Sequence, residues 1–161
     1  MSDNFSSNDF KELRWVRVFT PIHIPKYLVE QVKHRDYTVE DFYTYQEEIC
    51  IDESTGDLNP FNHLYVIVNG ENIVVGFLWF CVDPLTKDIA VQIFSMDSKY
   101  WNKGQAMGFA ADHLKGIRRK GKLKKIYWIS KYPRHAQKHG FNRSSHILME
   151  YDEDKENGQD A

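Results

Sequence analysis

The sequence has few cysteines, no long apolar run and no strong excess of charge of either sign. Cys50 and Cys81 are the only 2 cysteines in 161 residues, too few for a disulfide framework, and their spacing fits neither a zinc knuckle nor a redox pair. The longest apolar run, from Ile73 to Val82, is far too short to span a bilayer. The first ten residues lack the basic and apolar regions of a signal peptide. These absences predict a cytoplasmic protein without a membrane partner.

The charges nearly cancel. Lysine and arginine number 21 and aspartate and glutamate 23, a net charge of −2, which argues against a protein that coats nucleic acid over its whole surface. Hydrophobic residues (42%) and aromatic residues (14%) suffice for one folded core. Because both ends are polar, we expect a flexible segment over 1–11, one domain over 12–151 and an acidic disordered tail over 152–161.

Hydrophobic periodicity predicts the element order β-α-α-β-β-β-α-β-α-β. Thr38 is the expected N-cap of the second helix, with Asp41 at its third position. Asn69-Gly70, which tolerates positive φ, predicts a tight hairpin turn between two β-rich runs. The remaining expected elements are a first strand over 13–21, a helix entered through Pro25, strands over 88–97 and 124–130, a helix over 104–120, a short helix over 133–140 and a last strand over 146–152.

The stretch YWNKGQAMGFAADHL, residues 100–114, follows a predicted strand and turns into a predicted helix. The first N–H groups of a helix lack intrahelical partners and lie at the positive end of its dipole, so they suit a diphosphate. Gly104, Ala106 and Gly108 are small enough for a ligand to approach the backbone closely. Neither the P-loop motif nor the dinucleotide-binding GxGxxG motif is present.

This stretch resembles the acyl-CoA loop of the GNAT superfamily of N-acetyltransferases, Gln/Arg-x-x-Gly-x-Gly/Ala, with Lys103 for the leading residue and Ala106 for the first glycine of the pattern. The longer sequence is similar to the Tyr-Trp-Gly-Lys-Gly-Tyr-Ala stretch of bacterial acetyltransferases that act on ribosomal-protein N-termini. Gly140-Phe141 resembles the Gly-Phe that closes a short helix near the end of the family. The resemblance covers about residues 12–151. It implies a single-domain α/β fold, with a GNAT-like mixed, mostly antiparallel central sheet flanked by helices.

The resemblance also implies a site that uses acetyl-CoA as co-substrate and no metal. In the family the strand before the loop splays from its neighbour, and the pantetheine arm lies in the resulting V. Carried over by position, the backbone groups that would bind the pantetheine are those of Ile93, Phe94, Ser95 and Met96. The amides that would face the diphosphate belong to Asn102, Lys103, Gly104, Gln105, Ala106, Met107 and Gly108.

The catalytic groups are less clear. A direct transfer needs one group to accept the proton of the amine and another to protonate the departing thiolate. The family often places a tyrosine acid at the position of Ala136, so Tyr132 and Ser130 are the alternative candidates here. Gln92 cannot act as a base, and Asp97 is expected to be a turn residue. The leading hypothesis is an acyl-CoA-dependent N-acetyltransferase acting on a primary amine, which could be a protein N-terminus, a lysine or a small amine. A catalytically inactive GNAT-fold binding or structural protein is the alternative.

Several other features have two interpretations. Residues 115–125 hold seven basic side chains, which form either a solvated helix end or a site for an acidic partner, nucleic-acid phosphates or the CoA 3′-phosphate. His135 and His139 could ligate a metal, but a solvent-facing pair is the simpler interpretation. Tyr100-Trp101 either packs the loop or rims the ligand, and Phe77, Trp79 and Phe94 form core or pantetheine wall. The region over 29–62 is expected to form an acceptor wall, and a homodimer remains an open alternative.

Overall fold

A five-stranded sheet with the strand order β1-β2-β3-β4-β5 organises the molecule. The computed structural model describes residues 10–32, 37–50, 60–130, 132–145 and 149–151. The first four strands are antiparallel to their neighbours, and β5 lies parallel to β4. The strands are β1 (Arg14–Arg17), β2 (Asn62–Val68), β3 (Val74–Val82), β4 (Ile89–Met96) and β5 (Ile126–Trp128).

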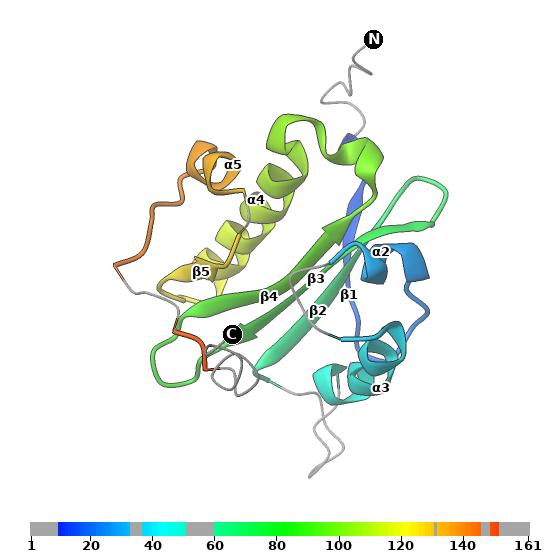
Figure 1. The fold of residues 1–161 in the computed structure, drawn as a ribbon, viewed down its shortest axis with the longest axis horizontal. Helices are drawn as coiled ribbons and strands as arrows, with labels where there is room; N and C mark the ends of the chain where they lie inside the picture. Colours follow the sequence, from blue (N-terminus) through cyan, green and yellow to red (C-terminus); the bar gives the residue numbers. More distant parts are fainter. Residues whose placement is uncertain (1–9, 33–36, 51–59, 131, 146–148, 152–161) are drawn as a thin grey trace, which may run out of the picture.

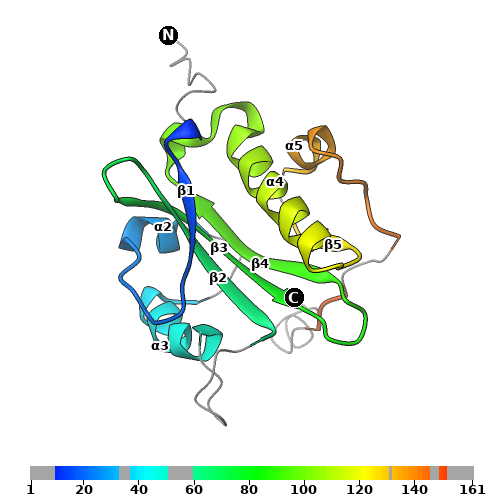
Figure 2. The ribbon, with the colours of Figure 1, turned by 180° about the vertical axis from the view of Figure 1, so that it is seen from behind.

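Helices cover both faces of this sheet (Figures 1 and 2). One face carries α2 (Lys26–Glu30) and α3 (Val39–Cys50), whose side chains pack with Leu64, Phe77 and Ile93 in one buried cluster. The other face carries α4 (Gln105–Lys120), followed by α5 (Pro133–Lys138) after β5. In the part of the chain that is described, no helix has the length and apolar character needed to cross a membrane.

The four predicted helices are present, but some ends differ: α2 begins directly after Pro25 and ends at Glu30, and α5 ends at Lys138 rather than at residue 140. Asp41 N–H donates to Thr38 Oγ1 over 3.0 Å and Thr38 N–H to Asp41 Oδ2 over 2.9 Å, so the expected capping arrangement of α3 is confirmed. The hydrophobic spacing of the sequence places Met107, Ala110, Ala111, Leu114 and Ile117 on one face of α4. This face packs inward, with Leu114 fully enclosed and Ile117 partly buried. Pro133 begins α5, and Gly140, with a φ of 89°, follows its end.

Two local predictions fare differently. The hairpin between β2 and β3 is confirmed, but the tight Asn69-Gly70 turn is wrong, because the positive φ of 62° belongs to Asn72. Asn69 Oδ1 accepts from the N–H groups of Glu71 and Ile73, which stabilises a longer loop. The predicted final strand falls partly on residues 146–148, outside the described residues, and 149–151 form no strand.

Candidate active site

A bulge in β4 creates the site. Trp79 pairs with Ile93 and the next residue, Phe80, pairs with Val91, so Gln92 has no opposite residue on β3. The extra residue changes which face the following side chains point to. Val91 packs on the α4 face of the sheet, whereas Ile93 packs on the α2 and α3 face. A one-residue insertion has this effect because side chains alternate along a strand.

The strands β4 and β5 separate just after the bulge. Their parallel pairing runs from Ile89 opposite Ile126 to Val91 opposite Trp128, while β4 continues to Met96. The second half of β4 therefore has no strand on its outer edge among the described residues. This is the divergence that the sequence resemblance implied.

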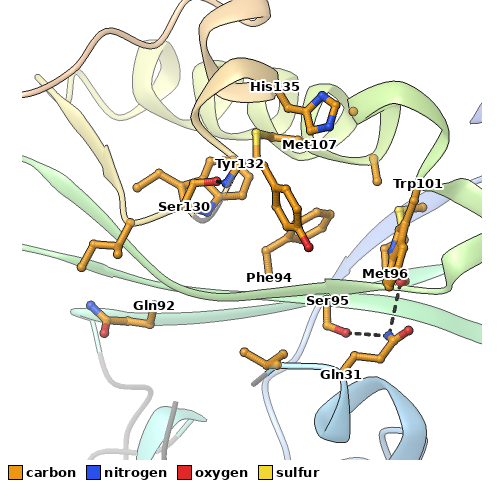
Figure 3. A pocket seen from close by; sticks show the side chains of 15 residues that line it. Gln31, Gln92, Phe94, Ser95, Met96, Trp101, Met107, Ser130, Tyr132 and His135 are labelled. Carbon is orange, nitrogen blue, oxygen red and sulfur yellow. Dashed lines mark hydrogen bonds between the residues drawn. The ribbon is translucent and has the colours of Figure 1, made fainter. Parts of the chain in front are cut away.

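A cavity of about 370 Å³ occupies this divergence. It passes the free edge of β4 and reaches from the end of α2 to the first turn of α4 (Figure 3). Its size falls within the range of small-molecule sites. The lining residues are Gln31, Val32, Gln92, Phe94, Ser95, Met96, Trp101, Gly104, Ala106, Met107, Trp128, Ile129, Ser130, Tyr132 and His135.

The α2 side of the cavity is a hydrogen-bonded polar surface. Ser95 Oγ donates to the Leu28 carbonyl oxygen over 2.6 Å and accepts from Gln31 Nε2 over 3.1 Å. The Met96 carbonyl oxygen accepts from Gln31 Nε2 over 3.3 Å and from Trp101 Nε1 over 2.7 Å. These bonds fix the end of β4, so the cavity has a preformed wall on this side.

The opposite side is formed by the segment between β5 and α5. Tyr132 extends from this segment across the cavity toward β4, and its side chain is 62% exposed (Figure 3). Its backbone N–H donates to Ser130 Oγ over 2.9 Å. Phe94 faces Trp128 edge-on, with ring centroids 5.7 Å apart, and supplies the apolar wall. Of the aromatic string singled out in the sequence, Phe77 is fully buried core and Trp79 packs beside it.

The loop before α4 positions the helix start. Asp97 Oδ1 accepts from Lys99 N–H and caps a short 3₁₀ helix, η1 (Ser98–Tyr100), which agrees with a turn role. The second 3₁₀ turn, η2 (Asn102–Gly104), contains Lys103 with a φ of 49° and ends at Gly104 with a φ of 85°. Helix geometry supplies no intrahelical partner for the N–H groups of Ala106 and Met107 in the first turn. Both residues line the cavity.

The two residues of Tyr100-Trp101 divide their roles. Tyr100 is buried and packs edge-on against Phe10, with ring centroids 5.7 Å apart. Trp101 is half exposed and lines the cavity. Tyr100 is therefore a packing residue, and Trp101 lies at the rim of the cavity.

Asp97 is held by a neighbouring hydroxyl as well as by the turn. Tyr27 Oη donates to Asp97 Oδ2 over 2.9 Å. Burial, then the hydrogen bond to Asp97, raises the pKa of Tyr27 to about 12. No carboxylate lies among the described residues that line the cavity.

The glycines of the loop allow α5 to pack closely. A Cβ on Gly104 would lie 2.6 Å from His135 Nδ1, and a Cβ on Gly108 would lie 2.9 Å from His139 Nε2. His139 Nε2 lies 3.0 Å from the Gly104 carbonyl oxygen, and Lys115 Nζ donates to the His139 carbonyl oxygen over 2.6 Å. The expectation that the two histidines face solvent is therefore wrong, because both pack on α4. The described residues contain no metal-binding cluster of three such side chains.

The cavity brings together most of the residues singled out in the sequence. Gly108 lies one turn into α4 against His139, and Ile93 is buried in the core. The predicted site residues that line the cavity are Phe94, Ser95, Met96, Gly104, Ala106, Met107, Ser130 and Tyr132. The predicted residues Asn102, Lys103 and Gln105 are not among the lining residues.

Some lining residues were not assigned to the site from the sequence. They are Gln31, Val32, Trp128, Ile129 and His135. The sequence signal that could have pointed to His135 is its position directly before Ala136, where the resemblance places a tyrosine. Gln31 and Val32 fall within the region expected to form the acceptor wall. Much of that region, over 33–36 and 51–59, lies outside the described residues.

The basic segment lies at the other end of α4. Arg118, Arg119 and Lys120 are exposed in its last turn, about 20 Å along the helix axis from Gln105. Arg118 Nε donates to the Lys124 carbonyl oxygen over 2.5 Å. The segment is thus a cationic helix end that complements the dipole, remote from the cavity.

Comparisons with solved structures identify the fold. No protein-family model matches the chain, and no curated protein matches its sequence. The chain is similar to glucosamine-6-phosphate N-acetyltransferase from Arabidopsis thaliana, with a TM-score of 0.61 and 13% identity over 86% of this chain and 97% of that one. It is similar to a GNAT-family structure from Desulfovibrio desulfuricans, with a TM-score of 0.59 and 15% identity over 83% and 87% of the two chains. A third similar structure is AAC(6')-Iy in complex with the bisubstrate analog CoA-S-monomethyl-acetylneamine, with a TM-score of 0.60 and 13% identity over 87% and 97%.

The chain therefore has the fold of the GNAT N-acetyltransferases. The likeness extends over more than four fifths of this chain in each comparison. It confirms the predicted single-domain α/β architecture with a mostly antiparallel sheet flanked by helices.

Proposed function

We propose that the protein is an acyl-CoA-dependent N-acetyltransferase that moves an acetyl group to a primary amine. The observation that carries the proposal is the cavity between β4 and β5, which joins the divergent strand edges to the first turn of α4. An extended thioester arm fits the uncovered edge of β4, where backbone groups can bind it as they would bind an added strand. Its diphosphate would meet the amides of Ala106 and Met107.

The cavity is lined from both sides of the sheet, by Gln31 at the end of α2 and by Met107 of α4, which suits a reaction between two substrates. The amine would enter from the side of Gln31 and Ser95, and the thioester from the side of Met107 and α5. The amine nitrogen attacks the thioester carbonyl carbon, the carbon–sulfur bond breaks, and the thiolate takes up a proton. We assign that proton transfer to Tyr132, with Ser130 as the neighbouring hydroxyl, and the proton of the amine to water.

Two measurements test the proposal. The purified protein should melt at a higher temperature with acetyl-CoA, since a ligand that binds only the native state stabilises it. It should also release free CoA thiol when a panel of amines and peptides is supplied. Tyr132→Phe should lower kcat by about 100-fold or more, with acetyl-CoA affinity unchanged. An unchanged kcat would remove Tyr132 from the mechanism, and the absence of any melting shift would refute the site.

A second candidate function is a binding protein that retains the fold without turnover. Ala136 is buried where the resemblance places the tyrosine acid, and the described lining residues include no carboxylate base. Thermal stabilisation by acetyl-CoA without product from any acceptor in the panel would favour this second function.

A further inference from the structure

His135 has no role in the proposed reaction, yet its ring lies at the phosphate end of the cavity. It is the only lining side chain of the described residues, apart from Tyr132, that can ionise. Its Nδ1, Cγ and Cβ are the atoms nearest to where a Cβ on Gly104 would lie, and Gly104 directly precedes α4. The ring is therefore held at the N-terminus of α4, and it lines the same cavity as Ala106 and Met107.

The position of α5 is fixed by contacts other than those of His135. His139 Nε2 donates to the Gly104 carbonyl oxygen over 3.0 Å, and Lys115 Nζ holds the His139 carbonyl oxygen from the third turn of α4. Ala136 is buried between them. His135 is thus presented to the cavity by a helix that is anchored on α4 through His139, one turn further along.

The environment of the two ring nitrogens determines which one can meet a ligand. Nδ1 of His135 is buried and has no hydrogen-bond partner. A buried N–H without an acceptor is costly, so the neutral ring carries its proton on Nε2. Because the Cβ, Cγ and Nδ1 side of the ring faces Gly104, the edge left to line the cavity is the one that carries Nε2.

We propose that His135 donates a hydrogen bond from Nε2 to the diphosphate of the acyl-CoA substrate. The side chain thereby distinguishes CoA thioesters from pantetheine thioesters that lack a diphosphate. The inference rests on the proposed function, because it takes the cavity to be the thioester site. His135 would add a side-chain donor to the backbone amides that are proposed to bind the diphosphate. Hydrogen bonds to a charged acceptor are stronger than those between neutral groups.

The experiment measures dissociation constants of three thioesters with the full chain by calorimetry. The ligands are acetyl-CoA, acetyl-3′-dephospho-CoA, which keeps the diphosphate, and S-acetylpantetheine, which lacks it. His135→Leu should raise the dissociation constants of acetyl-CoA and acetyl-3′-dephospho-CoA by about 10-fold or more and leave that of S-acetylpantetheine unchanged. His135→Gln should restore most of the loss, because its amide N–H reaches the position of Nε2, whereas His135→Asn should not. Lys138→Ala is the matched control, since it removes a cation from α5 at a residue that does not line the cavity.

The outcomes separate this inference from the proposed function. No binding of acetyl-CoA by the native chain would overturn both. Native binding with unchanged affinity in His135→Leu would overturn the diphosphate contact alone. An equal loss for all three thioesters would also overturn it, because a residue that only positions α5 would affect the pantetheine arm as well. Melting temperatures without ligand, compared between His135→Leu and His135→Gln, show whether both variants are folded to the same degree.

Discussion

His113 makes the stability of the fold depend on pH in a way that one substitution can isolate. The ring stacks on Trp15 with centroids 4.2 Å apart and an interplanar angle of 4°, and it meets Tyr65 edge-on at 4.6 Å. Its Nε2 is buried without a hydrogen-bond partner. Burial, and secondarily the charge of Lys120, lowers the pKa of His113 from 6.5 to about 4.

The direction of the pH dependence follows from which state of the chain, native or unfolded, binds the proton more readily. Between pH 6.5 and pH 4 the unfolded chain protonates this histidine and the native chain does not. The free energy of unfolding therefore falls as the pH falls through this window, by up to about 1.4 kcal/mol per pH unit and about 3 kcal/mol in all. At pH 7.5 both states are neutral at this position and the effect is absent.

His113→Phe removes the titrating group and keeps the aromatic stack. At pH 7.5 the variant should be as stable as the native chain or more stable by about 1 kcal/mol, because an unpartnered polar nitrogen leaves the interior. Urea denaturation at pH values from 7.5 to 4.5 gives the free energy of unfolding for both proteins. The variant's advantage should grow steadily below pH 6.5. A stability difference that stays constant across the whole range would refute the reasoning.

The comparison of the two proteins is needed because another histidine acts in the same direction. Burial, and then the charge of Arg17, lowers the pKa of His63. Its contribution is present in both proteins and cancels in the difference, provided the two sites do not interact.

Three further predictions concern folding and the site. Gly76→Ala should lower the free energy of unfolding by about 1–3 kcal/mol, since the new Cβ would lie 2.9 Å from the Ser95 carbonyl oxygen and from Ile67 Cδ1. Gly116→Ala in α4 should raise it by about 1 kcal/mol, because the new Cβ meets nothing within 4 Å. Urea midpoints that move in the same direction for both variants would contradict this prediction. Thr38→Ala should cost about 1 kcal/mol through loss of the α3 cap, and an equal effect of Thr38→Ser would argue against the cap. Gly108→Ala should lower the melting temperature, because the new Cβ would displace His139. An unchanged melting temperature would show that α5 can shift without loss of stability.

The parts of the fold that depend on neighbours in sequence were predictable. The Thr38 and Asp41 pair marks a helix start, and the spacing of Ala110, Ala111 and Leu114 marks the buried face of α4. Each signal spans only a few residues. The structure places these elements as the sequence predicted.

The resemblance led to most of the residues that line the cavity, but the contacts between distant segments that shape it could not be predicted from the sequence. The bulge at Gln92 exists only relative to β3, so nothing in the sequence of β4 reveals at which residue the register shifts. The function of Gly104 and Gly108 as contact points for the α5 histidines is equally non-local. A small residue shows that something approaches its backbone, but it does not show what approaches.

The arrangement of α5 couples two ends of the cavity mechanically. The helix starts directly after Tyr132, carries His135 at the end of the cavity near Gly104, and rests on α4 through His139. Tyr132 and His135 therefore belong to one continuous segment, which His139 holds against α4. In the proposed reaction, any movement of α5 away from α4 would displace Tyr132, the assigned proton donor, together with His135.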